Sequence, residues 1–245
     1  MKNIERNQAL IAELEKYDTP AVTNVVASYP LREEVCLGLY SPWTQRWSSN
    51  NDLKCHTPEL GSKAGYAVTC VIGMQEPGFN RLSYRDLFDA IEKSTKPVIV
   101  CLQQDFPEEI KKRSGPTGGM ICGALKRLGA VGLITDGPVR DLQEIKELGN
   151  FQYMSNGLAP GHGVVYVRAV NVPVHICGMD IAPGEIIHTD VNGAVKFPAD
   201  KLEAVVEKLK ILSNYEIKLA ARVREADSTA EAVKKAFFEP IDGIR

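Results

Sequence analysis

Three charged side chains follow one short apolar segment closely enough to act together. The segment Ala130 to Ile134 is followed by Asp136 and then by the adjacent pair Arg140 and Asp141. The planar guanidinium group of an arginine can donate hydrogen bonds to a carboxylate or keto oxygen, and a neighbouring carboxylate can bind a hard divalent cation. The same pattern also fits a helix cap with a surface ion pair. The residue types therefore indicate either a ligand and metal site or a local structural cap.

The predicted elements around these residues place them at the edge of a sheet. A short run rich in Val, Leu and Ile is typical of a strand buried on both faces, here ending near Thr135. Asp136-Gly137-Pro138 has turn chemistry, and helical spacing runs from Asp141 to Leu148, with Gly149 placed for the C-cap. Arg140 and Asp141 are therefore expected at a helix N-terminus, where backbone N–H groups and the helix dipole favour anions.

A glycine-rich loop lies upstream and leads into the same region. Ser114-Gly115-Pro116-Thr117-Gly118-Gly119 must bend sharply, and it feeds a helical segment from Met120 to Leu128. Glycines let backbone amides approach a carboxylate or phosphate closely, although a glycine pair also serves as a plain loop. The loop is a second candidate for anion binding.

These segments together resemble a known family. The stretch GGMICGALKRLGAVGLITDGPVRD, Gly118 to Asp141, resembles the signature of the RraA-like family. That family contains divalent-metal-dependent 4-hydroxy-4-methyl-2-oxoglutarate (HMG) and 4-carboxy-4-hydroxy-2-oxoadipate aldolases, and also the regulator of ribonuclease activity A. Four further segments resemble the family in the same order along the chain: Tyr17 to Asn24, Gly65 to Thr69, Asn156 to Pro160 and Val172 to Pro198.

The resemblance implies roles for particular residues. It makes Asp141 the metal ligand, for Mg²⁺ or Mn²⁺ with waters in other positions, and Arg140 the catalytic residue that binds the pyruvyl part of the substrate. The same moiety would be held by backbone amides of the turn Gly118, Gly119, Met120 and Ile121. The implied reaction is that of a lyase on a 2-keto acid: aldol cleavage of an HMG-like substrate releasing pyruvate, or decarboxylation of oxaloacetate. Both pass through an enolate that metal and Arg140 can stabilise.

Two positions depart from the aldolase pattern. The aldolases have an acidic residue twenty-one positions before the arginine, where this chain has Gly119, and an aspartate in the opening motif, where it has Asn24 after Thr23. His162 and His188 are candidate replacement proton donors, with a structural role as the alternative. Because regulatory members also lack the acid, the alternative function is a non-catalytic protein that binds and inhibits a partner.

Composition limits the other classes of function. The chain has 245 residues, 44% of them hydrophobic, and a formal net charge of −2. It has no apolar run of about eighteen residues, no signal-like N-terminus and no C-x-x-C pair among six cysteines, which predicts a soluble, cytoplasmic protein with reduced thiols. The net charge disfavours nucleic-acid binding. The chain also lacks the G-x-G-x-x-G motif that a Rossmann oxidoreductase would carry. The short cluster Lys111-Lys112-Arg113 either guides an anionic substrate or is a solvated face.

The remaining pattern predicts one mixed α/β domain over residues 1–245. Helices are expected from Ile4 to Tyr17 and from Thr23 to Ser28, and Ser83 to Asp86 is typical of a helix cap. A loop-rich insertion near 31–58 holds both tryptophans, and a C-terminal docking helix near 200–224 is expected to be capped by Asp200 with Glu203. The family resemblance implies an RraA-like swivelling ββα domain, a layered α/β sandwich, and assembly into a homotrimer or homohexamer.

Overall fold

The fold is built on one mixed sheet. The computed structural model describes residues 2–28, 34–76, 78 and 82–241. The strands are β1 (Lys54–Cys55), β2 (Lys63–Gly73), β3 (Val98–Asp105), β4 (Ala130–Thr135), β5 (Gln152–Ser155), β6 (Tyr166–Val170), β7 (Val174–Ile176), β8 (Met179–Ile181), β9 (Ile186–Asp190) and β10 (Gly193–Phe197). The helices are α1 (Lys2–Leu14), α2 (Thr19–Val26), α3 (Tyr84–Lys93), α4 (Glu108–Lys111), α5 (Gly119–Arg127), α6 (Leu142–Glu147), α7 (Leu202–Glu225) and α8 (Ala230–Phe238), with 3-10 turns at Pro58–Leu60 and Ala199–Lys201.

Parallel strands form the centre of the sheet and antiparallel strands complete it. The strand order is β1-β5-β4-β3-β2-β9-β10, and β6 also pairs with β2. The strands β2 to β5 are parallel to one another. The long strand β2 pairs with β9 at its start and with β6 at its end, where the register shifts between Val71 and Ile72. This nearly closed arrangement confirms the predicted mixed α/β fold.

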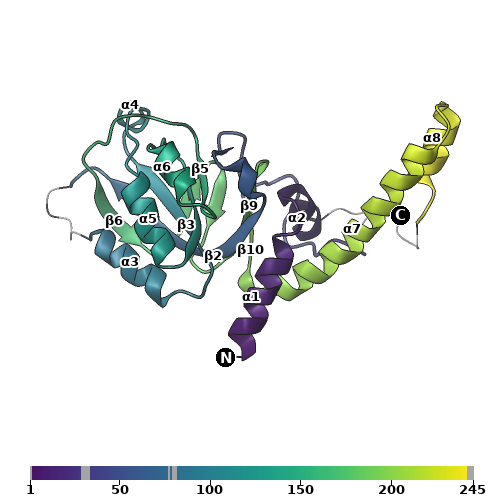
Figure 1. Ribbon diagram of the computed structural model, residues 1–245, viewed down its shortest axis with the longest axis horizontal. Helices are drawn as coiled ribbons and strands as arrows, with labels where there is room; N and C mark the ends of the chain where they lie inside the picture. Colours follow the sequence, from purple (N-terminus) through teal and green to yellow (C-terminus); the bar gives the residue numbers. More distant parts are fainter. Residues whose placement is uncertain (1, 29–33, 77, 79–81, 242–245) are drawn as a thin grey trace.

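Three hydrophobic clusters hold the layers together. Helices α3, α5 and α6 cover one face of the sheet, with Leu87, Leu125 and Ile145 buried against it (Figure 1). The hairpin β7–β8 covers the other face, where Ile176 and Met179 join Ile99 and Cys101 of β3 and Ile134 of β4. Helices α1, α2 and α7 enclose a third cluster beside β9 and β10. The region between β4, α5 and α6 is therefore fixed by packing on one face of the sheet.

The starts of three helices test the sequence predictions. The capping box before α3 is confirmed, since Ser83 accepts from Arg85 N–H and Asp86 accepts from Ser83 N–H. The predicted start of the second helix at Thr23 is wrong, because α2 begins four residues earlier, at Thr19. Asp18 caps it by accepting from the N–H of Ala21. The predicted cap by Asp200 is also wrong, because a 3-10 turn precedes α7 and its N-cap position makes no side-chain hydrogen bond.

Residues 34–58 consist mainly of turns and irregular chain around β1; positions 31–33 of the predicted insertion lie outside the described residues. The two tryptophans have different surroundings. Trp47 is buried and stacks on Tyr40 with ring centroids 5.6 Å apart, whereas Trp43 is exposed. One aromatic side chain therefore anchors this segment to the cluster of α1, α2 and α7.

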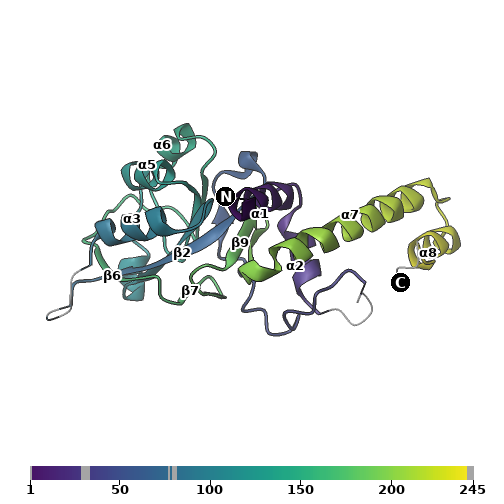
Figure 2. The ribbon, with the colours of Figure 1, turned by 90° about the horizontal axis from the view of Figure 1, so that it is seen from below.

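The C-terminal helices form an arm that extends away from the sheet (Figures 1 and 2). The first half of α7 packs on the core through residues such as Leu202, Leu209 and Leu212, and α8 folds back beside its far end. Within α8 the buried residue is Ala236. In the described part of the chain, no helix combines the length and the apolar character needed to cross a membrane.

Candidate functional site

The side chain of Asp141 turns toward the start of α5. Strand β4 ends at Thr135 as predicted, and Asp141 occupies the N-cap position of α6 with φ 57° and ψ 38°. It makes no capping bond to α6; instead its Oδ2 accepts a hydrogen bond of 3.3 Å from the N–H of Gly119. A left-handed backbone is uncommon for a residue other than glycine. The carboxylate therefore faces the N-terminus of the neighbouring helix. Of the structural alternative, the ion pair with Arg140 is present and the side-chain cap of α6 is absent.

Glycine at position 118 makes room for this carboxylate. Gly118 is the N-cap of α5 and has no side chain to bond the first amides of the helix. A Cβ built on Gly118 would lie 2.2 Å from Asp141 Oδ2 and 3.1 Å from Arg140 Nε. Because real Cβ contacts are never that short, any other residue would displace the carboxylate. The positive end of the helix dipole is thus open toward Asp141 and Arg140.

The guanidinium of Arg140 retains an unsatisfied donor. Arg140 Nε lies 3.4 Å from Asp141 Oδ2, and the Arg140 side chain is 28% exposed. Among the described residues, Nε is a buried atom that lacks a hydrogen-bond partner. Buried polar atoms are nearly always paired, so this donor is suited to a ligand oxygen such as that of a carboxylate or ketone.

Backbone hydrogen bonds hold the surrounding loops in place. The carbonyl oxygen of Thr117 accepts from Arg140 N–H at 3.1 Å and from the hydroxyl of Tyr153 at 2.8 Å. The N–H of Gly115 donates to Gly161 O at 2.7 Å, and Val139 exchanges bonds with the loop that follows β5. The glycine loop and the loops after β4 and β5 are therefore tied into one unit.

Glu144 is a site residue that the sequence predictions missed. A Cβ built on Gly119 would lie 2.0 Å from Glu144 Oε2 and 2.9 Å from Glu144 Cβ. The carboxylate of Glu144 thus occupies the space directly above Gly119, where a larger side chain would stand. The signal was present in the sequence, because Glu144 follows Asp141 by three residues and such pairs share a helix face.

A cavity of about 370 Å³ adjoins this group. It is lined by residues of two loops and the start of α6, namely Val139, Arg140, Asp141, Leu142, Leu158, Ala159 and Pro160. The predicted turn of Gly118, Gly119, Met120 and Ile121 forms the N-cap and first residues of α5 next to Asp141. Met120 is 86% exposed. The structure thus brings all the predicted site residues together, and their roles stay predictions.

Other candidate residues lie elsewhere. Asp136 turns away from Arg140: its Oδ2 pairs with Lys111 Nζ at 2.6 Å and its Oδ1 accepts from Gln104 N–H at 2.7 Å. Burial raises the pKa of the Asp136 carboxyl. His188 is fully buried, with Nδ1 3.0 Å from Thr19 Oγ1 at the start of α2. It therefore cannot supply a proton at this site.

The opening motif also lies apart from the site within one chain. Asn24 belongs to α2, which packs on α7, β9 and β10 at the end of the sheet away from α5 and α6 (Figure 1). His162 is exposed in the loop that follows Pro160. The asparagine in place of an acid therefore does not alter the contacts of Asp141 within one chain.

The donors at this site fit a water-rich metal. Among the residues that the structure describes, no group of three His, Cys, Asp or Glu side chains is placed to hold a metal ion. Asp141 is a single carboxylate beside a cavity whose other charged lining residue is Arg140, with Glu144 nearby. Mg²⁺ keeps several waters and commonly takes only one or two protein carboxylates. Asp141 is thus a suitable ligand for such an ion.

The chain is similar to curated proteins over part of its length. An uncharacterized protein of Methanocaldococcus jannaschii is 32% identical over 147 residues, which are 58% of this chain and 69% of that protein. A protein of Halalkalibacterium halodurans named "Putative 4-hydroxy-4-methyl-2-oxoglutarate aldolase" is 32% identical over 94 residues, 38% of this chain and 44% of that protein.

Solved structures share the fold at low sequence identity. An uncharacterized protein from Pseudomonas syringae pv. tomato has a TM-score of 0.67 and 17% identity, with 94% of this chain and 96% of that chain covered. Streptomyces coelicolor RraAS2, described as an unusual member of the RNase ES inhibitor RraA protein family, has a TM-score of 0.60 and 19% identity, with 87% and 96% covered.

A family model agrees with these similarities. The model described as RraA-like (Aldolase/RraA) matches residues 43–196, which include the glycine loop, β4, Arg140 and Asp141. This range is more than half of the chain. The chain therefore belongs to the RraA-like family, which includes both aldolases and regulatory members.

Proposed function

We propose that this protein is a divalent-metal-dependent lyase that acts on a 2-keto acid. The reaction is aldol cleavage of a substrate like 4-hydroxy-4-methyl-2-oxoglutarate, releasing pyruvate, or decarboxylation of oxaloacetate. The observation that carries the proposal is the convergence of Arg140, Asp141 and Glu144 on the start of α5, where the N-cap residue Gly118 has no side chain. Similarity to a protein named as an aldolase supports the same class of reaction.

Each of these residues has chemistry that suits the reaction. The Nε of Arg140, which makes no hydrogen bond among the described residues, can donate to the keto oxygen, and this bond strengthens as negative charge develops there. The N–H groups at the start of α5 other than that of Gly119, which Asp141 accepts, can bind the carboxylate of the substrate, because that helix end favours anions. Together they would hold the 2-keto acid in one orientation beside Asp141.

Two acids complete the proposed machinery. Asp141 is the residue that would hold Mg²⁺ or Mn²⁺, and the bound ion would supply Lewis-acid stabilisation of the developing enolate. Glu144 would hold the proton that the enolate carbon receives after the carbon–carbon bond breaks. Its carboxylate lies over Gly119, so an acid is present at this position although residue 119 is a glycine.

Pyruvate formation tests the proposal. Purified protein is assayed with 4-hydroxy-4-methyl-2-oxoglutarate, 4-carboxy-4-hydroxy-2-oxoadipate and oxaloacetate, each with Mg²⁺ or Mn²⁺ and with EDTA. Turnover is expected only with metal, and Arg140→Ala should lower it by about 100-fold or more because an oxyanion donor is lost. Arg127→Ala is the matched control, since Arg127 is exposed at the far end of α5.

The alternative is a non-catalytic regulatory protein that binds a partner. It predicts no turnover with any of the three substrates and capture of a partner protein that persists in Asp141→Asn. Absence of turnover together with absence of metal-dependent oxalate binding would refute the lyase proposal. Oxalate is the probe because it resembles the enolate of pyruvate.

A further inference from the structure

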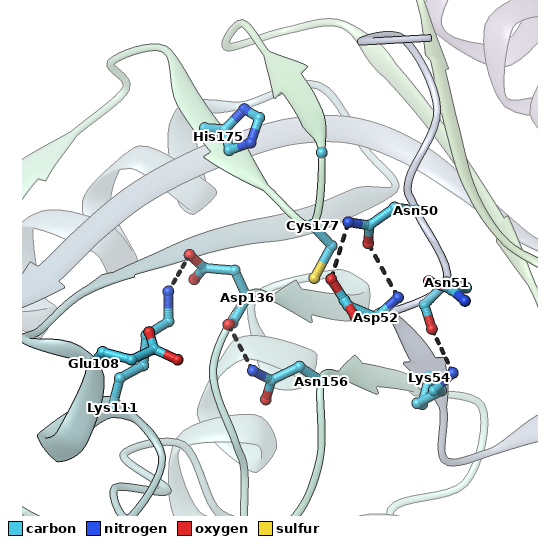
Figure 3. Close-up of a pocket in the computed structure, with 11 residues that line it drawn as sticks. Asn50, Asn51, Asp52, Lys54, Glu108, Lys111, Asp136, Asn156, His175 and Cys177 are labelled. Carbon is cyan, nitrogen blue, oxygen red and sulfur yellow. Dashed lines mark hydrogen bonds and ion pairs between the residues drawn. The ribbon is translucent and has the colours of Figure 1, made fainter.

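The loop that carries Arg140 is held by different contacts at its two ends. At its start, Asp136 lines a second cavity, of about 590 Å³, and two side chains bond it there (Figure 3). Lys111 Nζ lies 2.6 Å from Asp136 Oδ2, and the side-chain amide of Asn156 donates to the carbonyl oxygen of Asp136 at 3.0 Å. At its end, the N–H of Arg140 donates to the carbonyl oxygen of Thr117 at 3.1 Å. The position of Arg140 relative to α5 therefore depends on where the Thr117 carbonyl is held.

The hydroxyl of Tyr153 bonds to this same carbonyl oxygen. Tyr153 Oη donates to Thr117 O at 2.8 Å and lies 3.2 Å from Thr117 Oγ1. Because the hydroxyl proton of Tyr153 is used on the carbonyl, the threonine hydroxyl is the donor of the second bond. Both residues are fully buried, so these bonds are shielded from bulk water. The Tyr153 hydroxyl therefore fixes the peptide group that directly precedes Gly118, the N-cap of α5.

The backbone of Tyr153 is a firm support for this hydroxyl. Its N–H donates to Thr57 Oγ1 at 3.0 Å, and its carbonyl oxygen accepts from the N–H of His56 at 2.9 Å. On the other side, β5 is parallel to β4, with Tyr153 opposite Leu133. The ring belongs to the hydrophobic cluster that also includes Leu125 of α5. The sheet therefore holds the hydroxyl at one place beside the start of α5.

The hydroxyl of Tyr153 is not needed to fill this space, because phenylalanine has the same ring. A buried hydroxyl costs free energy unless it is hydrogen-bonded. Burial raises the pKa of the Tyr153 hydroxyl, so it keeps the proton with which it bonds Thr117 O. Tyr84 is a contrast, since its buried hydroxyl lacks a hydrogen-bond partner among the described residues. The contribution of the Tyr153 hydroxyl therefore lies in its bonds to Thr117.

The two groups that would bind the substrate are linked through this peptide group. The N–H groups at the start of α5 beyond Gly119 would bind the carboxylate, and Arg140 Nε would bind the keto oxygen. The bond of Arg140 N–H to Thr117 O joins the two segments, as does the longer bond of 3.3 Å from Gly119 N–H to Asp141 Oδ2. A keto acid held at both points needs them at a fixed separation, because a misplacement of about 1 Å can cost roughly 100-fold in rate.

We propose that Tyr153 is a positioning residue of the candidate site. Its hydroxyl holds the Thr117 carbonyl and thereby sets the separation between the start of α5 and Arg140. Tyr153 acts only through these groups, since it is fully buried. Its effect on catalysis rests on the proposed lyase function, whereas its effect on the two loops does not.

Steady-state kinetics tests the effect on catalysis. Tyr153→Phe should lower kcat for pyruvate release by about 10-fold and change KM by less than about 3-fold, because the ring is kept and only the alignment is lost. Tyr84→Phe is the matched control, since it removes a buried hydroxyl that bonds to no described residue, and it should keep the wild-type constants. In an Arg140→Ala background, Tyr153→Phe should have little further effect, because the group that it positions is gone. An equal effect of Tyr153→Phe in both backgrounds would overturn the proposal.

Hydrogen exchange tests the effect on the loops without any turnover. Mass spectrometry of segments 115–121 and 136–142 should show exchange about 10-fold faster in Tyr153→Phe, from the loss of one hydrogen bond, and unchanged in Tyr84→Phe. Thermal unfolding midpoints verify that both variants fold. Wild-type protein without turnover would refute the lyase function, and the exchange rates alone would then decide the role of Tyr153. Exchange that is the same in the two variants would overturn that role whatever the activity assay shows.

Discussion

In the proposed reaction, Glu144 supplies the acid that is missing at Gly119. Its carboxylate fills the space next to Gly119, so we expect Glu144→Gln to lower kcat for pyruvate release by about 100-fold while KM changes little. The amide keeps the shape of the side chain but cannot transfer a proton. Steady-state kinetics with the most active substrate measures this.

The control for that variant lies on the same helix. Glu147→Gln changes an exposed carboxylate near the end of α6 and should leave both constants unchanged. Exchange of the methyl protons of pyruvate with deuterium should be slowed in Glu144→Gln and not in Glu147→Gln. If exchange and turnover are the same in both variants, another group handles the proton.

Buried His188 should make the protein less stable in mild acid. Burial lowers the pKa of His188 from 6.5 to about 4 in the folded protein. Between these two pKa values His188 is protonated in the unfolded chain and neutral in the folded protein. The free energy of unfolding therefore decreases as the pH falls from about 6.5 to 4. The full decrease in the free energy of unfolding is on the order of 3 kcal/mol.

Denaturant unfolding from pH 7.5 to 4 measures this dependence. His188→Gln should reduce the slope of stability against pH, whatever its effect on stability at pH 7.5. His162→Gln, which changes an exposed histidine, should retain the wild-type slope. A slope that is unchanged in His188→Gln would assign the acid sensitivity to other groups.

Two glycines of helix α5 should affect different properties, Gly118 at its N-cap the activity and Gly123 inside the helix the stability. Gly118→Ala would place a Cβ 2.2 Å from Asp141 Oδ2, so we expect the carboxylate to move and metal-dependent turnover to fall by about 10-fold or more. Gly123→Ala is the matched change in the same helix. Its Cβ would meet Leu148 Cδ2 at an ordinary 3.7 Å.

The two variants should separate stability from function. Gly123→Ala should raise the free energy of unfolding by about 0.5–1 kcal/mol, because alanine favours a helix more than glycine does, and should leave turnover intact. Turnover in Gly118→Ala equal to that of Gly123→Ala would show that the position of the Asp141 carboxylate does not matter. Calorimetry and the pyruvate assay are the two measurements.

Across the whole molecule, the arm should be much less stable than the sheet. Helix α8 buries only Ala236, whereas β2 is paired along its length and buried over most of it. Native-state hydrogen exchange is therefore expected to be fast in residues 230–238 and slowest in β2 and β3. Protection of α8 equal to that of β3 would show that the arm is covered in solution.

Assembly is the other property of the whole molecule. The family resemblance predicts a homotrimer or homohexamer, and each chain has a mass of 26.9 kDa. Light scattering after gel filtration measures the mass of the assembly. A monomer would contradict this prediction and would leave the apolar side chains around the candidate site, such as Met120 and Leu158, exposed to solvent.

The sequence alone determined the local features: the strand Ala130–Thr135, the glycine loop, the helix start at Asp141 and the membership of an α/β family. Hydrophobic period and turn chemistry act over a few residues, so they can be read from the chain. Only the tertiary structure decided that Asp141 turns to α5, that Glu144 covers Gly119, and that Asp136 faces another cavity. These contacts join residues from separate elements, and the packing of α5 and α6 on the sheet determines them.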